Sequence, residues 1–258
     1  MDLAPPLPPS HLRSATQRVR WASEEWGARE LYCPVCPADR LQRLPNNARA
    51  RDFICPECQQ CFQLKGSRAS SMRIVPDGAY RTMLEAVLSA SVPHLLLMRY
   101  SPDWTVRDLF VVPAFFLTPD AIVRREPLRE SARRAGWEGC NISLQRIPPD
   151  GKIAIVAGAR PVPRHEVRQR FARTQTLAQV EIRSRGWTLD VLAVLRQIGA
   201  PRFNLDDVYA FAPQLAELHP GNRHVEAKIR QQLQILRDLG FVVFEGRGRY
   251  RLTGQTAG

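Results

Sequence analysis

Several absences narrow the roles open to this chain of 258 residues. It has no run of about 18 apolar residues, so the sequence predicts no membrane-spanning helix. Residues 1–10 are rich in proline and lack the charged-then-apolar pattern of a secretory signal, so we expect a short, flexible, extended tail. No segment repeats along the chain. These features predict a cytoplasmic globular protein without a membrane partner.

Acidic residues are scarce. Asp and Glu number 25 against 37 Lys and Arg, which leaves a formal net charge of +12. A positive surplus strengthens binding to any polyanion, because binding releases condensed counterions. The charge balance therefore favours nucleic acid as the partner.

Cysteine is also infrequent, yet four of the six cysteines form two Cys-x-x-Cys pairs. The pairs are Cys33/Cys36 and Cys55/Cys58. Cytosolic thiols stay reduced, so this spacing indicates a metal site and not disulfides. Two such turns can complete a closed tetrahedral shell that leaves no position for a substrate, so we expect a structural metal. Cys61 is a rival ligand by position, but on its strand we expect it to serve as a small apolar residue. Cys140 has no partner cysteine and is expected to be buried.

An acidic residue and a polar-x-Lys triplet surround the second cysteine pair. Asp52 precedes the pair, and Gln63-Leu64-Lys65 begins eleven positions after Asp52. Metal-dependent nucleases of the PD-(D/E)xK type place an acid at the end of one strand and such a triplet on the next strand. There they hold a divalent ion beside a phosphodiester.

Each residue of this pattern has an expected role. Asp52 and the Leu64 carbonyl would bind the metal, and Lys65 would stabilise or orient the nucleophile. Gln63 stands where an acid is usual, so its amide oxygen would be a weaker ligand. Glu24 or Glu25, on an expected helix over residues 17–26, could supply a second carboxylate.

Apolar runs of strand length predict a central sheet, which makes the expected fold class α/β. The expected strands cover residues 52–55, 61–65, 95–99, 109–112 and 153–156. A polar turn is expected at residues 45–47, a helix from Tyr80 through Val87, and an irregular arginine-rich stretch over residues 124–141. In that stretch Trp137 lies between glycines and near Arg133 and Arg134, where an exposed indole could stack on or wedge between bases.

After about residue 180 the pattern changes to three helices followed by a basic hairpin, which is typical of a winged helix. Thr188 is expected to cap the first helix, which stops at Gly199, and Trp187 is expected in the core. The third helix buries Val225 and Ile229. Its opposite face carries Arg230, Gln231 and Gln234, residue types that suit base edges in the major groove. Arg247 and Arg249 on the wing would contact phosphates.

Taken together, these residues resemble the DpnI family of methyl-dependent restriction endonucleases. The most specific stretches are the paired cysteine knuckles with Asp52 and residues 77–80, 132–141, 184–188 and 229–238. The resemblance implies a PD-(D/E)xK nuclease core with inserted zinc knuckles and a C-terminal winged helix, both reading methylated GATC. It also implies cleavage that needs Mg²⁺. The family triad maps onto Asp52, Gln63 and Lys65, with Glu in the family where this chain has Gln63, and the intercalating tryptophan maps onto Trp137.

The leading hypothesis is a monomeric, Mg²⁺-dependent type II endonuclease that cuts double-stranded DNA at GATC sites methylated at N6 of adenine. The expected divisions are a tail (1–10), a catalytic domain with zinc (11–180) and a winged-helix domain (181–258). The alternative is a methyl-DNA binding protein in which Gln63 marks an impaired catalytic site. A zinc-ribbon transcription regulator, which would also bind unmethylated sites, is a third option.

Overall fold

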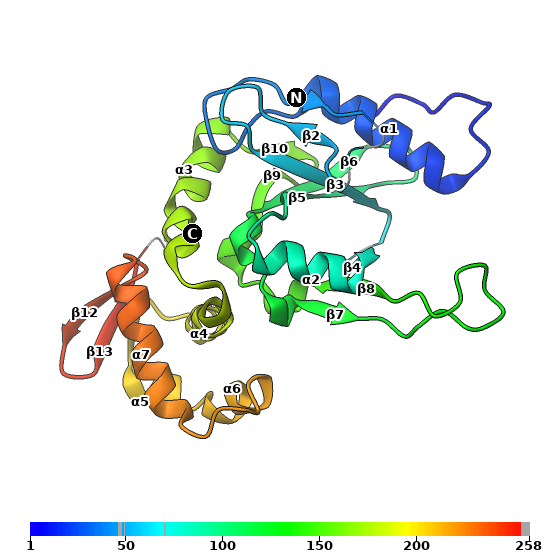
Figure 1. Ribbon diagram of the computed structural model, residues 1–258. Coiled ribbons are helices and arrows are strands. Elements are labelled where there is room, and N and C mark those ends of the chain that lie inside the picture. The colour runs from blue at the N-terminus through cyan, green and yellow to red at the C-terminus, as the bar shows by residue number, and fades with distance from the viewer. Residues whose placement is uncertain (46–47, 49, 70, 254–258) are drawn as a thin grey trace.

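A computed structural model describes residues 1–45, 48, 50–69 and 71–253. The turn expected at residues 45–47 and the last five residues of the expected C-terminal domain fall largely outside this description. The described chain is a mixed α/β structure with a curled main sheet and a C-terminal helical domain (Figure 1).

The main sheet positions the residues on which the proposed chemistry depends. Its strands in spatial order are β1 (Gln42–Arg43), β2 (Phe53–Ile54), β3 (Cys61–Ser67), β5 (His94–Tyr100), β6 (Val106–Val112), β9 (Ile153–Ala157) and β10 (Arg160–Pro161). Strands β3 and β5 run parallel, whereas the other neighbouring pairs are antiparallel.

Strand β5 is buried on both faces because the sheet lies between two cores. Leu95 and Leu97 belong to one apolar cluster, and Leu96 and Met98 belong to the other. Alternate residues of a strand point to opposite faces, so a continuous apolar run is what a doubly covered strand requires. One face packs against α1 (Ala15–Glu30) and α3 (Arg164–Thr174), and the other against α2 (Tyr80–Leu88).

A second sheet lies beside α2. Its order is β4 (Ile74–Ala79), β8 (Gly139–Ser143) and β7 (Ile122–Arg124). Short 3-10 turns occur at Ala114–Phe116, Pro119–Ala121, Leu144–Arg146, Pro149–Gly151 and Gln175–Gln179. The stretch over residues 124–141, expected to be irregular throughout, is therefore strand at both ends, because β4 supplies a partner from far away in the sequence.

The C-terminal domain has the expected helices and a small sheet. Its elements are α4 (Ile182–Ile198), β11 (Arg202–Asn204), α5 (Leu205–Tyr209), α6 (Ala212–Leu218), α7 (Val225–Asp238), β12 (Val242–Gly246) and β13 (Arg249–Leu252). Helix α4 ends where Gly199 takes a left-handed φ of 72°, as a C-terminal glycine allows. The expected second helix is two helices, α5 and α6, with Pro213 in the first turn of α6.

Two expectations about α4 have different outcomes. The expected cap at Thr188 was wrong, because the helix starts at Ile182 and the Glu181 carboxylate accepts from the N–H groups of Arg183 and Ser184. Thr188 is instead buried, with its hydroxyl bonded to Gln232 at 2.7 Å. The core position of Trp187 is confirmed, since its ring stacks on His219 at a centroid distance of 4.0 Å.

Helix α4 packs on both domains. Towards the main sheet, Arg196 binds Asp150 through two hydrogen bonds of 2.8 and 2.6 Å, and Arg146 lies 3.2 Å from Asp190. Buried Arg185 donates to backbone carbonyls, including that of Phe115. The apolar cluster that contains Leu95 and Leu97 accordingly continues into the C-terminal helices.

The first ten residues form no helix or strand, but they lie against the neighbouring domain. The Leu3 carbonyl accepts from the Val106 N–H at 2.8 Å, and the Trp26 indole donates to the Asp2 carbonyl at 2.8 Å. The extended conformation agrees with the proline-rich composition.

Candidate functional site

The hairpin of β2 and β3 brings the acid and the triplet together. Phe53 pairs with Phe62, and the Asp52 N–H donates to the Phe62 carbonyl at 2.9 Å. One further step of this register places Asp52 opposite Gln63. Because side chains alternate along a strand, Gln63 and Lys65 share one face of β3.

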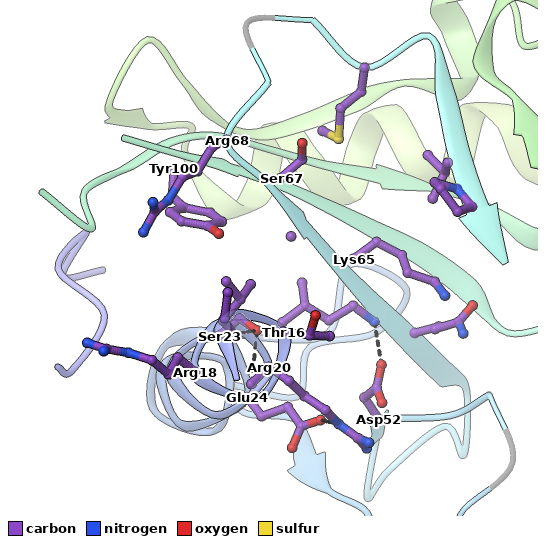
Figure 2. Close-up of a pocket in the computed structure, with 18 of the residues that line it drawn as sticks. Thr16, Arg18, Arg20, Ser23, Glu24, Asp52, Lys65, Ser67, Arg68 and Tyr100 are labelled. Atoms are coloured by element: carbon purple, nitrogen blue, oxygen red, sulfur yellow. Dashed lines mark hydrogen bonds and ion pairs between the residues drawn. The ribbon is translucent and has the colours of Figure 1, made fainter. Parts of the chain in front are cut away.

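These residues line one hollow of about 1220 Å³ (Figure 2). Asp52 and the triplet form one wall, and Thr16, Arg20 and Glu24 of α1 form another. The predicted Asp52 and Lys65 are therefore both part of the lining of one hollow.

Asp52 is half-buried at the edge of this hollow. Its Oδ2 accepts from the Leu64 N–H at 2.7 Å. Burial raises the pKa of the Asp52 carboxyl; the Leu64 N–H lowers it, and the neighbouring charge of Glu24 raises it. The N–H and C=O of a strand residue point to the same edge, so the Leu64 carbonyl faces the Asp52 side as well. A cation placed here would offset the cost of burying the carboxylate.

Lys65 is paired with a residue that the sequence pattern did not single out for chemistry. Its Nζ lies 3.0 Å from Oδ1 of Asp77, on β4 of the second sheet. The Asp77 carboxylate also accepts from the Gly78 N–H at 2.8 Å. Lys65 therefore connects the main sheet to the second sheet.

Gln63 is buried between two hollows. It lines the large hollow and also a smaller one of about 520 Å³, which lies towards α2. An amide oxygen can bind a divalent ion, although without the charge of a carboxylate.

The two candidate helix carboxylates have different positions. Glu24 is buried and lines the hollow, with its oxygens 2.5 Å from Arg20 and 2.6 Å from Arg43. Glu25 pairs with Arg43 and is not among the residues that line the hollow. Glu24 is thus the carboxylate on the Asp52 side.

The hollow also has basic and aromatic side chains that were not predicted from the sequence. Arg13, Arg18 and Arg68 line it beside Tyr100 and Trp104. The two rings are stacked with centroids 5.2 Å apart, and the Arg68 guanidinium lies 5.5 and 5.4 Å from them. The sequence offered only a weak signal for two of them, since Arg13 and Arg18 stand close to the start of α1. A basic, aromatic lining suits a nucleic-acid backbone.

The four cysteines of the two pairs meet in space. Their ligand atoms all lie within 4.8 Å of one another, with Sγ–Sγ distances of 3.6 Å for Cys33–Cys58 and 3.4 Å for Cys36–Cys55. Zinc–sulfur bonds of about 2.3 Å in a tetrahedron give sulfur separations of about 3.8 Å. The cluster can therefore hold a metal such as zinc. Cys61 is outside it, and Cys140 is fully buried.

Arg168 of α3 fixes the first cysteine turn to the protein. Its guanidinium donates to the carbonyls of Cys33, Pro37 and Ala38 at 3.0 to 3.1 Å. The metal cluster is thereby attached both to the β2–β3 hairpin and to the helix behind it.

The loop between β7 and β8 projects away from the body of the protein (Figure 1). Trp137 is half-buried there, with its ring against Gly139 and the Arg134 guanidinium 4.9 Å from the ring centroid. A Cβ at residue 139 would lie 2.9 Å from the indole, so glycine is required for this packing. Arg133 and Arg134 are exposed.

The candidate DNA-reading residues of the C-terminal domain are at the surface. Arg230, Gln231 and Gln234 are exposed on α7, and Arg247 and Arg249 are exposed around the turn between β12 and β13. Gln232 points inward instead, which explains why only part of the glutamine run is available to a partner. This arrangement suits insertion of α7 into a major groove.

No helix among the described residues is long and apolar enough to cross a membrane. Comparison with protein families gives two matches. Residues 9–180 match the DpnI model, described as the Dam-replacing family, and residues 183–252 match the DpnI_C model, described as the Dam-replacing HTH domain.

Proposed function

The chain belongs to the DpnI family of restriction endonucleases, and we propose on this basis that it hydrolyses double-stranded DNA at GATC sites methylated at N6 of adenine. The observation that carries the proposal is the shared hollow of Asp52, Gln63 and Lys65 on a chain with an HTH domain. We further propose that residues 11–180 form a PD-(D/E)xK nuclease domain, residues 181–258 a winged-helix domain and residues 1–10 a tail.

In this proposal Asp52, the Leu64 carbonyl and the Gln63 amide oxygen would hold Mg²⁺. The ion would stabilise the charge that develops on the phosphate as water attacks. Lys65 would orient or stabilise the attacking water. Glu24 is the nearby carboxylate that could add charge to the site, provided that Arg20 and Arg43 release it.

DNA binding would use both ends of the molecule. Trp137, Arg133 and Arg134 would engage the duplex beside the nuclease hollow. The exposed residues of α7 would read base edges, and Arg247 and Arg249 would bind phosphates. Burying one methyl group contributes only about 0.8 kcal/mol, so strict dependence on methylation needs two domains reading the mark or a polar group stranded in its absence.

Because the two unlike domains of one chain can both read a palindromic site, we propose that the active protein is a monomer. A homodimer that forms only on DNA would contradict this part of the proposal, and sedimentation of the protein–DNA complex measures it.

The test is digestion of one plasmid prepared from adenine-methylating and from non-methylating hosts, with Mg²⁺ present. We expect fragments that end at GATC from the methylated plasmid alone, and no fragments with Asp52→Ala. Equal digestion of the two plasmids would overturn methyl dependence, and full activity of Asp52→Ala would overturn the assigned site.

Gln63 favours one alternative, a methyl-DNA binding protein with an impaired catalytic site. That function predicts tight, methyl-specific binding in a gel-shift assay but no product with Mg²⁺ or Mn²⁺. The presence of both Asp52 and Lys65 in the hollow favours the nuclease, since binding alone needs neither.

A further inference from the structure

We propose that Asp77 is a positioning residue for Lys65, and that it links the DNA-facing loop 125–138 to the nuclease site. This inference rests on the proposed nuclease function. Its basis is the contact between the two sheets, where Lys65 forms an ion pair with Asp77.

The contact is sheltered enough to fix the ammonium group. The side chain of Asp77 is 9% exposed and that of Lys65 is 26% exposed, with 3.0 Å between Nζ and Oδ1. An ion pair shielded from water holds its geometry better than one on an open surface. Asp77 therefore sets where the Lys65 ammonium lies relative to Asp52.

The backbone around Asp77 explains how its carboxylate reaches the Lys65 ammonium. In β4, the pairing with β8 shifts register between Asp77 and Ala79. Such a bulge bends the strand and redirects a side chain, and bulges are frequent beside active sites. The Gly78 N–H then holds the carboxylate at 2.8 Å.

The same stretch of backbone leads directly to the loop. Asp77 pairs with Cys140 and Ala79 pairs with Gly139, while the Tyr80 N–H donates to the Glu138 carbonyl at 3.1 Å. Trp137 immediately precedes Glu138, and its ring packs on Gly139. A displacement of Trp137 by DNA would thus be transmitted through β8 and β4 to the carboxylate that holds Lys65.

Through this connection, binding of DNA by the loop can affect the position of Lys65 and therefore the rate of cleavage. A lysine that must orient a nucleophile loses rate when it is misplaced by about 1 Å, by up to roughly 100-fold. Binding of the correct site by the loop would place Asp77, and hence Lys65, in the productive position. Binding without that engagement would leave the ammonium out of place.

The experiment compares single-turnover cleavage of methylated duplex with DNA affinity measured in Ca²⁺. Asp77→Asn keeps an oxygen for the Gly78 N–H but removes the charge. We expect its cleavage rate constant to fall by roughly 10- to 100-fold while its dissociation constant for methylated duplex changes less than about twofold. Asp108→Asn, which alters a comparable ion pair with Arg99 away from the hollow, is the matched control and should cleave normally.

A double-mutant cycle tests the link to the loop. If Asp77 acts through the loop, the rate losses of Trp137→Ala and Asp77→Asn will not add in the double variant. Additive losses would overturn the link, and an unchanged rate in Asp77→Asn would overturn the positioning role. Should Asp77→Asn not fold, as judged by its thermal transition, Asp77→Glu keeps the charge but displaces it, and a normal rate in that variant would overturn the proposal.

The wild type and Asp52→Ala run in parallel to separate this inference from the proposed function. No cleavage by the wild type contradicts the nuclease itself, and the positioning role fails with it. Cleavage by the wild type with a normal Asp77→Asn contradicts the positioning role alone.

Discussion

At the scale of single residues, Gln63 decides how strongly the proposed site attracts its cation. It is buried on the same face of β3 as Lys65, so no other side chain of that strand can replace it there. A carboxylate at this position would carry a full negative charge towards the ion, whereas the amide contributes only a dipole.

We expect Gln63→Glu to lower the Mg²⁺ concentration needed for half-maximal cleavage by roughly tenfold, because an added charge near the ion contributes on the order of 1 kcal/mol or more. The measurement is the initial rate on methylated plasmid across a Mg²⁺ titration. Gln17→Glu adds the same charge on an exposed position of α1 and should leave the Mg²⁺ requirement unchanged. An unaltered requirement in Gln63→Glu would show that residue 63 does not face the ion.

The buried His94 should make the free energy of unfolding depend on pH. Burial lowers the pKa of His94 to about 4, and the ring is neutral, accepting from the Ala114 N–H at 2.9 Å. The unfolded chain takes up this proton near its ordinary pKa of about 6.5, so the unfolded state binds more protons between these values. The contribution of neutral His94 to the free energy of unfolding is therefore complete above pH 6.5. It decreases as the pH falls towards 4, by roughly 3 kcal/mol in total.

His94→Asn keeps an acceptor for the Ala114 N–H but cannot titrate, so it serves as the comparison. Urea unfolding at pH 7, 6, 5 and 4.5 should show the free-energy difference between wild type and His94→Asn shrinking as the pH falls. A constant difference over this range would contradict the buried, neutral imidazole.

Residues whose role depends on spacing along the chain could be predicted, and those that meet only in space could not. Asp52, Lys65 and the Cys55/Cys58 pair stand within the short β2–β3 hairpin, so sequence spacing nearly fixes their geometry. The first pair, Cys33/Cys36, is marked by its own Cys-x-x-Cys spacing. Asp77 reaches Lys65 from β4, and its distance from Lys65 along the chain gives no sign of this ion pair. Arg68 directly follows β3, but its contacts with Tyr100 and Trp104 depend on the fold. Their identification needed the tertiary structure.

At the scale of elements, the four-cysteine cluster supports one end of the β2–β3 hairpin. β2 pairs with β3 over only two residue pairs, and β1 adds two more on the outer side. With so few backbone hydrogen bonds, this edge of the sheet has little stability of its own in water. A bound metal would supply the cross-link that this edge of the sheet otherwise lacks.

We therefore expect Cys58→Ser to lose the bound metal and to lower the thermal midpoint by about 5 °C or more. Metal content by elemental analysis and differential scanning calorimetry provide the measurements, and a strong chelator should lower the midpoint of the wild type in the same way. Cys61→Ser, outside the cluster, should retain the metal. Retention of one metal per chain by Cys58→Ser would contradict the site.

Elements with strong local signals were predictable, whereas those stabilised by distant partners were not. The apolar run of β5 predicts a buried strand, and Gly199 marks the end of α4. Strands β7 and β8 have weak patterns of their own and form because β4 joins them. Thr188 suggested a helix start, but an earlier acidic cap at Glu181 and burial of the threonine beside α7 prevailed.

At the scale of the whole molecule, α4 unites the two domains energetically. The Arg196–Asp150 pair is largely shielded, with both side chains below 15% exposed at 14% and 13%. Removing one partner from such a pair leaves the other buried without compensation. The single apolar cluster that crosses this boundary implies joint unfolding.

Calorimetry should accordingly give one unfolding transition for the wild type. Arg196→Ala and Asp150→Ala should each cost about 1–3 kcal/mol, and the double variant should cost less than the sum, because neither charge is then stranded. Two separate transitions in the wild type, or strictly additive losses, would contradict a shared interface.

The same helix has a geometric consequence. An α-helix turns about 100° with each residue, so one residue inserted in the middle of α4 would rotate everything beyond it by that angle. The exposed face of α7 that we propose reads the groove would then be rotated relative to the hollow, even if both halves stayed intact. Insertions and deletions among natural variants should therefore occur in the loop after residue 125 or in the turn between β12 and β13. The length of α4 should stay constant, because it sets the orientation of the C-terminal domain relative to the hollow.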